Sequence, residues 1–516
     1  MLARCHSGAV LGPDAQAVEI EVNSSRATSS FAIVGLPDTA VREAKDRVST
    51  ALKNSGYATK TEFAVTVNLA PADLKKEGPV FDLAIAACLL QATGRLKSQI
   101  LEDCALIGEL ALSGRVRRVR GVLPVVMEMR RIGKRAILVP EENIDEASVV
   151  GGIDVIPVGT LREAAEFLSG EIQIEPRFTD LAALVATDMD RGDDFGDVKG
   201  QAIAKRAIEV AVAGGHNMLM IGSPGSGKTM LARRIPSILP PMSVEEALEV
   251  SRIHSVAGRE KCAGTFVTKR PFRSPHHTVS SIGLLGGGVH AVPGEVSLAH
   301  RGVLFLDEFA EFPRAALEVL RQPLEDGHVS VSRAAAACDY PSRFMLVAAM
   351  NPCPCGYYGD PSRECRCTQS QVLKYQQKIS GPLLDRIDLQ VCVNAVPVKD
   401  LESLQPGEPS AAIRERVARA REIQAGRYRG IPGVAVNADV KSRDLKDACR
   451  LTAEASAEIR RALESLRLSA RAYDRILRVA RTVADLAGKE RVDAECAMEA
   501  ISYRQLDENG GLEMWA

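Results

Sequence analysis

The sequence predicts an α/β protein in which a nucleotide-binding domain lies between an α/β N-terminal domain and an all-helical C-terminal domain. Three observations predict this fold class. A glycine-rich loop follows a short apolar run at residues 218–221. A second apolar run, at residues 303–306, ends in two acidic residues. From about residue 405 onward the pattern is helical. At 516 residues the chain is too long for one hydrophobic core, so several domains are expected.

The glycine-rich loop fits the phosphate-binding pattern G-x-x-x-x-G-K-[ST] at every fixed position. Its residues are Gly222, Ser223, Pro224, Gly225, Ser226, Gly227, Lys228 and Thr229. The apolar run before the loop predicts a buried strand, and Met230, after the loop, lies in the first turn of a predicted helix. The dipole at the N-terminus of that helix favours a bound phosphate. Glycines allow backbone N–H groups to surround phosphates. We therefore predict that this loop and Met230 bind ATP, with Lys228 on the β- and γ-phosphates and Thr229 on Mg²⁺.

The second apolar run predicts the strand that completes the nucleotide site. Asp307 and Glu308 follow Val303–Leu306, and ligands of open α/β sheets bind at the carboxyl ends of the strands. Asp307 is expected to hold Mg²⁺, directly or through water. Glu308 is expected to polarise the water that attacks the γ-phosphate. The pair of motifs predicts ATP hydrolysis, whereas a strand followed by an acidic pair is common on its own.

Composition excludes some classes of protein. The chain has 65 basic and 66 acidic residues, so any DNA contact is expected from a local patch. Aromatic residues make up 4%, which disfavours stacking platforms for single strands. The sequence has neither a long apolar span nor a secretory signal, which predicts a cytoplasmic protein without membrane contact. The twelve cysteines lie mostly among apolar residues, as in a reducing compartment.

Residues 1–170 are predicted to form an α/β domain, followed by a linker at 171–196. Strands are expected at 17–22, 63–68 and 136–140, and helices at about 38–56, 81–90 and 121–132. The segments Gly78–Ala84 and Gly121–Pro124 resemble the C-terminal domain of Lon protease. Val80 and Phe81 occupy the region of the protease serine, and residues 123–125 that of its lysine. A Ser–Lys dyad needs both groups, so we predict a domain without proteolytic activity.

The whole set of motifs resembles an AAA+ ATPase, most closely the magnesium-chelatase-like ComM/YifB family. The supporting segments lie at 197–201, 272–278, 304–308, 350–356 and 381–388. The resemblance implies a Lon-like domain at 1–170, an AAA+ domain at 197–400 and a helical lid at 401–508. It also implies a homo-hexameric ATP-dependent motor on single-stranded or branched DNA, acting in branch migration, recombination and natural transformation. Recombination proteins are implied as partners of the N-terminal domain.

Three further catalytic residues follow from this resemblance. Asn351 ends an apolar run and resembles the first sensor, which orients the attacking water; the alternative is a turn before Pro352. Arg386 resembles the arginine finger that reaches a neighbouring subunit's γ-phosphate. The alternative is an ion pair with Asp385 or Asp388. Arg471 resembles the second sensor of the lid, and the alternative is an ordinary surface arginine.

Two segments are predicted as insertions that face a central pore. Residues 272–296 are rich in glycine and apolar residues, and Leu284 and Leu285 are expected to couple hydrolysis to DNA movement. Residues 327–343 alternate and turn like a hairpin. Arg333, Arg343 and the pair 269–270 are candidates for phosphate contacts. The alternative for both segments is an ordinary surface loop. The basic residues at 75–76 and 115–120 are candidates for a basic surface of the N-terminal domain, and the alternative for them is a solvated face.

Four cysteines lie within the loop 353–367. Cys353, Cys355, Cys365 and Cys367 form two C-x-C pairs, which predicts a structural Cys₄ zinc site in a cytoplasmic protein. The alternative is a set of reduced thiols. Farther along, helices are expected at about 451–465, 469–487 and 492–504, with Arg475, Arg478 and Arg481 on the lid surface.

Two rival functions remain open from the sequence. One is the ATPase subunit of a metal-inserting chelatase, although the Lon-like domain and the cysteines argue against it. The other is a remodelling factor or a scaffold without hydrolysis, against which Lys228, Asp307, Glu308 and Arg386 argue.

Overall fold

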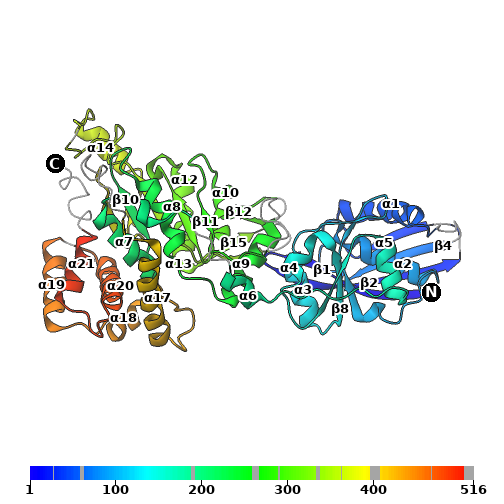
Figure 1. The fold of residues 1–516 in the computed structure, drawn as a ribbon. Helices are drawn as coiled ribbons and strands as arrows, with labels where there is room; N and C mark the ends of the chain where they lie inside the picture. Colours follow the sequence, from blue (N-terminus) through cyan, green and yellow to red (C-terminus); the bar gives the residue numbers. More distant parts are fainter. Residues whose placement is uncertain are drawn as a thin grey trace.

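The structure of the chain is a computed structural model. It describes residues 1–26, 28, 30–57, 63–187, 192–257, 266–288, 291–332, 337–361, 363–395, 407–466 and 468–504. Figure 1 shows an elongated molecule, with the N-terminal α/β part at one end, the nucleotide-binding part in the middle and the last helices at the other end.

The N-terminal part is built on a seven-stranded mixed sheet of order β3-β4-β2-β1-β5-β8-β9. Its strands are β1 (Leu2–Leu11), β2 (Asp14–Arg26), β3 (Ser30–Val34), β4 (Phe63–Ala70), β5 (Cys104–Leu106), β8 (Ala136–Pro140) and β9 (Asp154–Val158). The helices are α1 (Thr39–Asn54), α2 (Asp82–Ala92), α3 (Val122–Arg131) and α5 (Leu161–Ser169). The predicted strands and helices of this part are confirmed. Helix α2 is buried along almost its whole length, as its continuous apolar sequence requires.

The Lon-like segments lie at the start of α2 and α3. Phe81 and Val125 are buried, so apolar side chains fill the two regions where the protease has its serine and lysine. The predicted basic surface at residues 75–76 is wrong for Lys76, which is buried and donates its Nζ to the carbonyl of Pro71. Burial lowers the pKa of Lys76.

The middle part contains a parallel five-stranded sheet of order β11-β14-β17-β10-β18. Its strands are β10 (Met218–Ile221), β11 (Phe272–Arg273), β14 (Val303–Leu306), β17 (Met345–Met350) and β18 (Leu389–Cys392). Val303 and Phe305 pack on the side of α7 (Ala202–Gly214) and α8 (Lys228–Ile238), whereas Leu304 and Leu306 pack on the other side. Both faces are therefore covered, which explains the continuous apolar runs of the sequence.

The last part consists of helices. They are α17 (Ser410–Arg427), α18 (Ser442–Cys449), α19 (Ala453–Ser465), α20 (Ala470–Leu486) and α21 (Ala494–Ser502). Thr452, Ser469 and Asp493 cap the N-termini of the last three, each accepting a hydrogen bond from the backbone three residues on. The three predicted helices are confirmed. The ends of the predicted lid, at 401–406 and 505–508, lie outside the described residues.

The prediction that Arg475, Arg478 and Arg481 line the lid surface is wrong. Arg475 pairs with the buried Asp388 next to β18, and the Nε of Arg478 donates to a backbone carbonyl of the lid. Arg481 is 1% exposed, and its Nε lies 3.1 Å from Oδ1 of Asp485. Spacing placed these arginines on one face of α20 but did not show that this face turns inward. Asp388 and Asp485 supply the charge that burial of Arg475 and Arg481 requires.

The N-terminal part contacts the middle part through α9 (Val244–Ala257). Helix α3 packs against α9, and one apolar cluster joins Val125 and Met129 to Val250. Nη1 of Arg252 lies 2.7 Å from Oδ1 of Asp14. The segment predicted as a linker contains α6 (Leu181–Thr187), which also contacts α9; its residues 188–191 lie outside the described residues.

Asp485 gives a test of the buried charges. It is 2% exposed and also accepts a hydrogen bond of 2.9 Å from Nη1 of Arg427. We expect Asp485→Ala to destabilise the helical part by about 3–5 kcal/mol, because two guanidinium groups lose their buried counterion. Thermal unfolding monitored by circular dichroism measures the effect. The exposed Asp447 on α18 supplies the control, Asp447→Ala. Equal unfolding midpoints for the two variants would contradict the assignment.

Candidate nucleotide-binding site

The parallel sheet brings the predicted nucleotide-binding residues to one edge. Strands β14, β17 and β10 are neighbours, and each ends at that edge in a polar segment. The phosphate loop follows β10, Asp307 and Glu308 follow β14, and Asn351 follows β17. Motifs that lie far apart in the sequence thus meet because three apolar strands pair side by side.

Lys228 lies at the centre of this edge. Its Nζ donates hydrogen bonds to the carbonyls of Gly222 (2.7 Å) and Ser223 (2.9 Å) and lies 3.4 Å from Oδ1 of Asn351. Lys228 is 8% exposed, and burial lowers its pKa to about 8, against the opposing effect of Asp307. Gly227 reaches the start of α8 with a φ of 93°, a conformation that favours glycine. The loop is therefore shaped to surround a group that Lys228 contacts.

The residues predicted to hold Mg²⁺ are adjacent. The hydroxyl of Thr229 donates a hydrogen bond of 2.6 Å to Oδ2 of Asp307. A hydroxyl and a carboxylate are hard oxygen ligands, and Mg²⁺ at phosphate sites is bound by one or two such groups together with water and phosphate. The donor set therefore fits Mg²⁺ bound with a nucleotide.

His277, for which the sequence predicted no role, contacts Glu308. Nδ1 of His277 lies 3.0 Å from Oε2 of Glu308, and the rings of His276 and His277 are 4.1 Å apart. Glu308 itself has a φ of 52°, unusual for a residue with a side chain. The signal was present in the sequence, because His277 comes four residues after β11, the strand that neighbours β14. Side chains that follow adjacent parallel strands lie close together.

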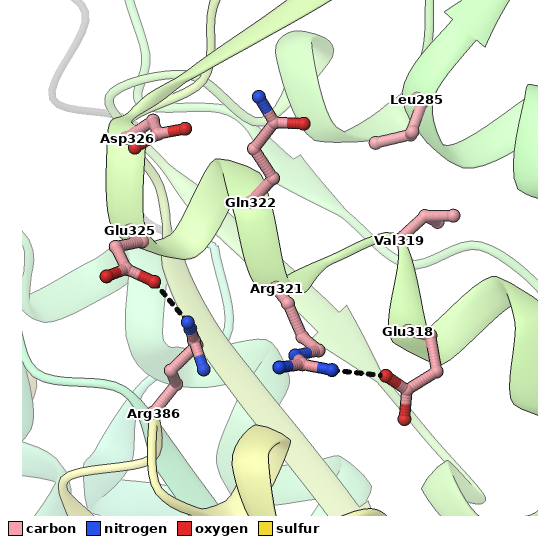
Figure 2. Close-up of a pocket in the computed structure, with 8 residues that line it drawn as sticks. All are labelled: Leu285, Glu318, Val319, Arg321, Gln322, Glu325, Asp326 and Arg386. Atoms are coloured by element: carbon pink, nitrogen blue, oxygen red, sulfur yellow. Dashed lines mark hydrogen bonds and ion pairs between the residues drawn. The ribbon is translucent and has the colours of Figure 1, made fainter.

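Arg386 lies in a pocket of about 430 Å³ that Figure 2 shows. Its guanidinium pairs with Glu325 of α13 (Arg321–Asp326), and Nη1 donates to the carbonyl of Pro382 at 2.8 Å. The side chain is only 14% exposed. Across the same pocket Arg321 pairs with Glu318 at 3.0 Å. An ion pair of Arg386 was considered from the sequence, but its partner is Glu325 and not Asp385 or Asp388.

Arg471 lies at the start of α20 with a side chain that is 69% exposed. Its Nη1 is 3.6 Å from Oδ2 of Asp385, the residue before Arg386. The structure therefore places Arg471 beside the segment of the candidate finger. Its role as a second sensor stays a prediction.

The two predicted insertions form small elements. The first contains α10 (Ser281–Leu285) and the paired strands β12 (Gly286–Gly287) and β13 (Val292–Pro293). The second forms the antiparallel hairpin of β15 (His328–Ser332) and β16 (Ala337–Pro341), which confirms the predicted hairpin. Residues 289–290 and 333–336, including the candidate Arg333, lie outside the described residues.

Several residues of these insertions do not lie as expected. Leu284 is 0% exposed, so the expectation that it faces a channel is wrong, and Leu285 lines the pocket of Arg386. The apolar residue that α10 does expose is Ile282, at 65%. Arg270 pairs with Glu246, and Nη1 of Arg343 donates to the carbonyl of Gly433 at 3.0 Å. These two arginines already bind groups of their own chain and are poor candidates for phosphate contacts.

The four predicted cysteines converge. The Sγ atom of Cys353 lies 3.4 Å from that of Cys355 and 3.7 Å from that of Cys365, and the sulfurs of Cys355 and Cys365 are 3.5 Å apart. All four Sγ atoms, including that of Cys367, lie within 4.8 Å of one another. Four bonds of about 2.3 Å in a tetrahedron place sulfurs about 3.8 Å apart. The cluster therefore fits a tetrahedral Cys₄ metal site.

Comparison with known families identifies the chain. Residues 194–401 match the family described as magnesium chelatase, subunit ChlI. Residues 20–143 match subunit ChlI of Mg-chelatase, and residues 407–504 match its C-terminal family. The chain is 42% identical to the uncharacterized protein YifB of Escherichia coli over 508 residues, which cover 98% of this chain and 97% of YifB. It is 41% identical to the competence protein ComM of Haemophilus influenzae over 508 residues, 98% of both chains.

The chain belongs to the magnesium-chelatase-like AAA+ family that includes YifB and ComM. Membership of this family implies an ATPase that uses ATP and Mg²⁺. The likeness to Lon protease 2 of Bacillus subtilis is weaker, 24% identity over 186 residues that cover 33% of this chain and 32% of the protease. Among the helices of the described residues, none is long and apolar enough to cross a membrane.

The low pKa of Lys228 gives a test of the family's nucleotide site. With a pKa of about 8, Lys228 is mostly neutral at pH 9, and a bound phosphate restores its charge. We therefore expect Lys228 to take up close to one proton when ATP binds at pH 9, and little when ATP binds at pH 7. The affinity for ATP is then expected to fall as the pH rises above 8. Calorimetry in two buffers with different ionisation enthalpies measures the uptake.

Lys228→Arg is the matched variant for this measurement, because arginine stays charged throughout the range. It is expected to bind ATP more weakly but without the additional proton uptake at pH 9. The same uptake at pH 9 in the wild type and in Lys228→Arg would contradict the role given to Lys228.

Proposed function

We propose that this chain is an ATP-driven motor that moves on DNA as a hexameric ring, with helicase or branch-migration activity in recombination and natural transformation. The observation that carries the proposal is the convergence of Lys228, Thr229, Asp307 and Asn351 in a chain similar over its full length to a competence protein. Competence concerns the uptake of DNA. The proposed cellular location is the cytoplasm, and the N-terminal part is the proposed docking domain for recombination proteins, without proteolytic activity.

In this proposal each residue of the site has one task. Lys228 neutralises phosphate charge, Thr229 and Asp307 hold Mg²⁺, and Asn351 orients the attacking water. Bound Mg²⁺ supplies charge that stabilises the transferring phosphoryl group. Glu308 accepts the proton of the water as general base. For this step the carboxylate of Glu308 has to leave its contact with His277 and accept a hydrogen bond from the water.

Hydrolysis in the proposed ring depends on the neighbouring subunit. Arg386 is held by Glu325 within its own chain, and its predicted target is the γ-phosphate bound by another copy. Glu325 is 65% exposed, so the carboxylate side of the pair is open to solvent, while Arg386 is 14% exposed. Arginine binds phosphate through bidentate charge-assisted hydrogen bonds, which are among the strongest hydrogen bonds in proteins. Assembly would therefore release the finger and complete the site.

The family descriptions favour a second candidate function. Chelatase subunits give their name to all three matched families, so a chelatase-like ATPase or a protein-remodelling factor is the alternative. The two candidates differ in one measurable property, because only the motor requires DNA to stimulate hydrolysis. In either case we propose that the cysteine cluster holds a structural Zn²⁺, since all four positions of a tetrahedral site are filled by protein.

The role of Glu308 is tested by Glu308→Gln. The amide cannot accept the proton, so we expect ATP binding to persist while hydrolysis falls by at least about 100-fold. Glu311→Gln is the control, since Glu311 lies three residues on and pairs with Lys378. Fluorescent-nucleotide binding and phosphate release measure the two properties. Turnover at the wild-type rate in Glu308→Gln would show that another group acts as the base.

The motor is tested with forked and Holliday-type DNA. We expect ATPase activity to rise with DNA, binding to weaken with salt, and ATP to drive strand displacement or branch migration. Arg386→Ala is expected to bind ATP, to lose hydrolysis and to inhibit wild-type subunits in mixed rings. Arg443→Ala, which removes an arginine that is 77% exposed, is the control. A protein that stays monomeric with ATP and DNA, and whose ATPase ignores every DNA, would favour the chelatase-like alternative.

A further inference from the structure

The cysteine cluster begins directly at the nucleotide site. Cys353 comes two residues after Asn351, which contacts Lys228, and it is 0% exposed. The chain then turns back, because the backbone N–H of Gly356 donates to the carbonyl of Cys353 at 3.0 Å. The segment that carries all four thiols therefore starts at the candidate sensor and returns toward the phosphate loop.

Gly356 lies directly against the phosphate loop. A Cβ atom built on Gly356 would lie 2.6 Å from Cδ and 2.7 Å from Cγ of Pro224, and 3.8 Å from Cγ of Asn351. Real Cβ atoms do not approach other atoms as closely as the first two distances. Gly356 also has a φ of 86°, which favours glycine. One residue inside the cysteine segment thus packs on the phosphate loop and lies next to the sensor.

Polar contacts hold parts of the cysteine segment. Arg363 lies over the ring of Tyr357 at 4.2 Å, and its Nη1 donates to the hydroxyl of Tyr357 at 2.8 Å. The side chain of Gln376 donates to the carbonyl of Pro352 at 3.1 Å. Of the four cysteines, Cys353 is buried and the other three are partly exposed. When a metal joins such ligands, the free energy of metal binding becomes free energy of folding.

We propose that one Zn²⁺ on Cys353, Cys355, Cys365 and Cys367 braces the phosphate loop through Gly356, so that metal binding and ATP binding stabilise each other. This inference rests on the proposed zinc site and on ATP binding at the phosphate loop. Loss of the metal would release Gly356 from Pro224 and remove the segment that packs beside Asn351. Coupling between two sites is reciprocal, so ATP also increases the affinity for zinc by the same factor.

The test uses the full chain with ATP and Mg²⁺ in the Glu308→Gln background, where ATP is not consumed. Three variants separate the steps. Cys365→Ser with Cys367→Ser removes two ligands, and Gly356→Ala keeps all four while adding a Cβ against Pro224. Gly430→Ala is the matched control, because Gly430 has a φ of 84° but open space around its missing Cβ. Elemental analysis gives zinc per chain, and titration gives the affinity for ATP.

We expect about one zinc per chain in the wild type, in Gly356→Ala and in Gly430→Ala. The ATP affinity should fall about tenfold in Gly356→Ala and in the cysteine variant, and stay unchanged in Gly430→Ala. Competition with a chromophoric chelator should show tighter zinc binding with ATP present. Should the cysteine variant fail to fold, Gly356→Ala carries the test alone.

The inference is overturned by wild-type protein without zinc, or by wild-type ATP affinity in Gly356→Ala or in a folded, zinc-free cysteine variant. A Glu308→Gln chain that binds zinc but no ATP would instead contradict the proposed nucleotide site.

Discussion

The parallel pairing of β17 with β14 on one side and β10 on the other is the constraint on which the site depends. Val303 pairs with Met345, and Met218 pairs with Val347. The polar residues that follow the three strands therefore lie side by side at one edge of the sheet. A shift of register by one residue would exchange the side chains that face the two covered sides of the sheet and would also move Lys228 relative to Asn351. The hydrophobic contacts on both faces of the sheet therefore fix the geometry of the catalytic edge.

The pairs that hold the site's outer residues are weaker than this core. Glu308 contacts His277, and Arg386 contacts Glu325; both carboxylates are more than half exposed. Because both carboxylates face solvent, each contact is open to exchange with water or with another group. The buried Asp388 and Asp485 behave differently, because their arginines join helices and strands in a low-dielectric interior. The molecule thus combines a sheet edge fixed by the core with candidate catalytic side chains whose carboxylate partners face solvent.

Much of the site could be predicted because its signals are local. The phosphate loop, the acidic pair after β14 and the cysteine spacing each lie within about twenty residues, and the backbone alone brings their members together. The contacts that were missed join distant segments. Glu325 lies 61 residues before Arg386, and nothing in the sequence showed that α13 faces this arginine.

Burial was the other property that local patterns did not determine. The helix 281–285 exposes Ile282 and buries Leu284, although both are apolar. Arg481 looked like a surface residue because charged side chains are rarely buried, and its counterion at Asp485 became evident only when the packing of α20 was known. Lys76 is a similar case, since its neighbour Lys75 is exposed and only the fold distinguishes them.

The central claim is that the ATP site is completed between subunits that encircle DNA. An experimental structure of the Glu308→Gln chain with ATP, Mg²⁺ and forked DNA tests it most directly. The account predicts a closed ring in which Arg386 has left Glu325 and lies against the γ-phosphate on a neighbouring subunit's Lys228, with DNA in the channel beside the β15–β16 hairpin. A ring in which Arg386 stays on Glu325, or DNA bound away from the channel, would contradict it.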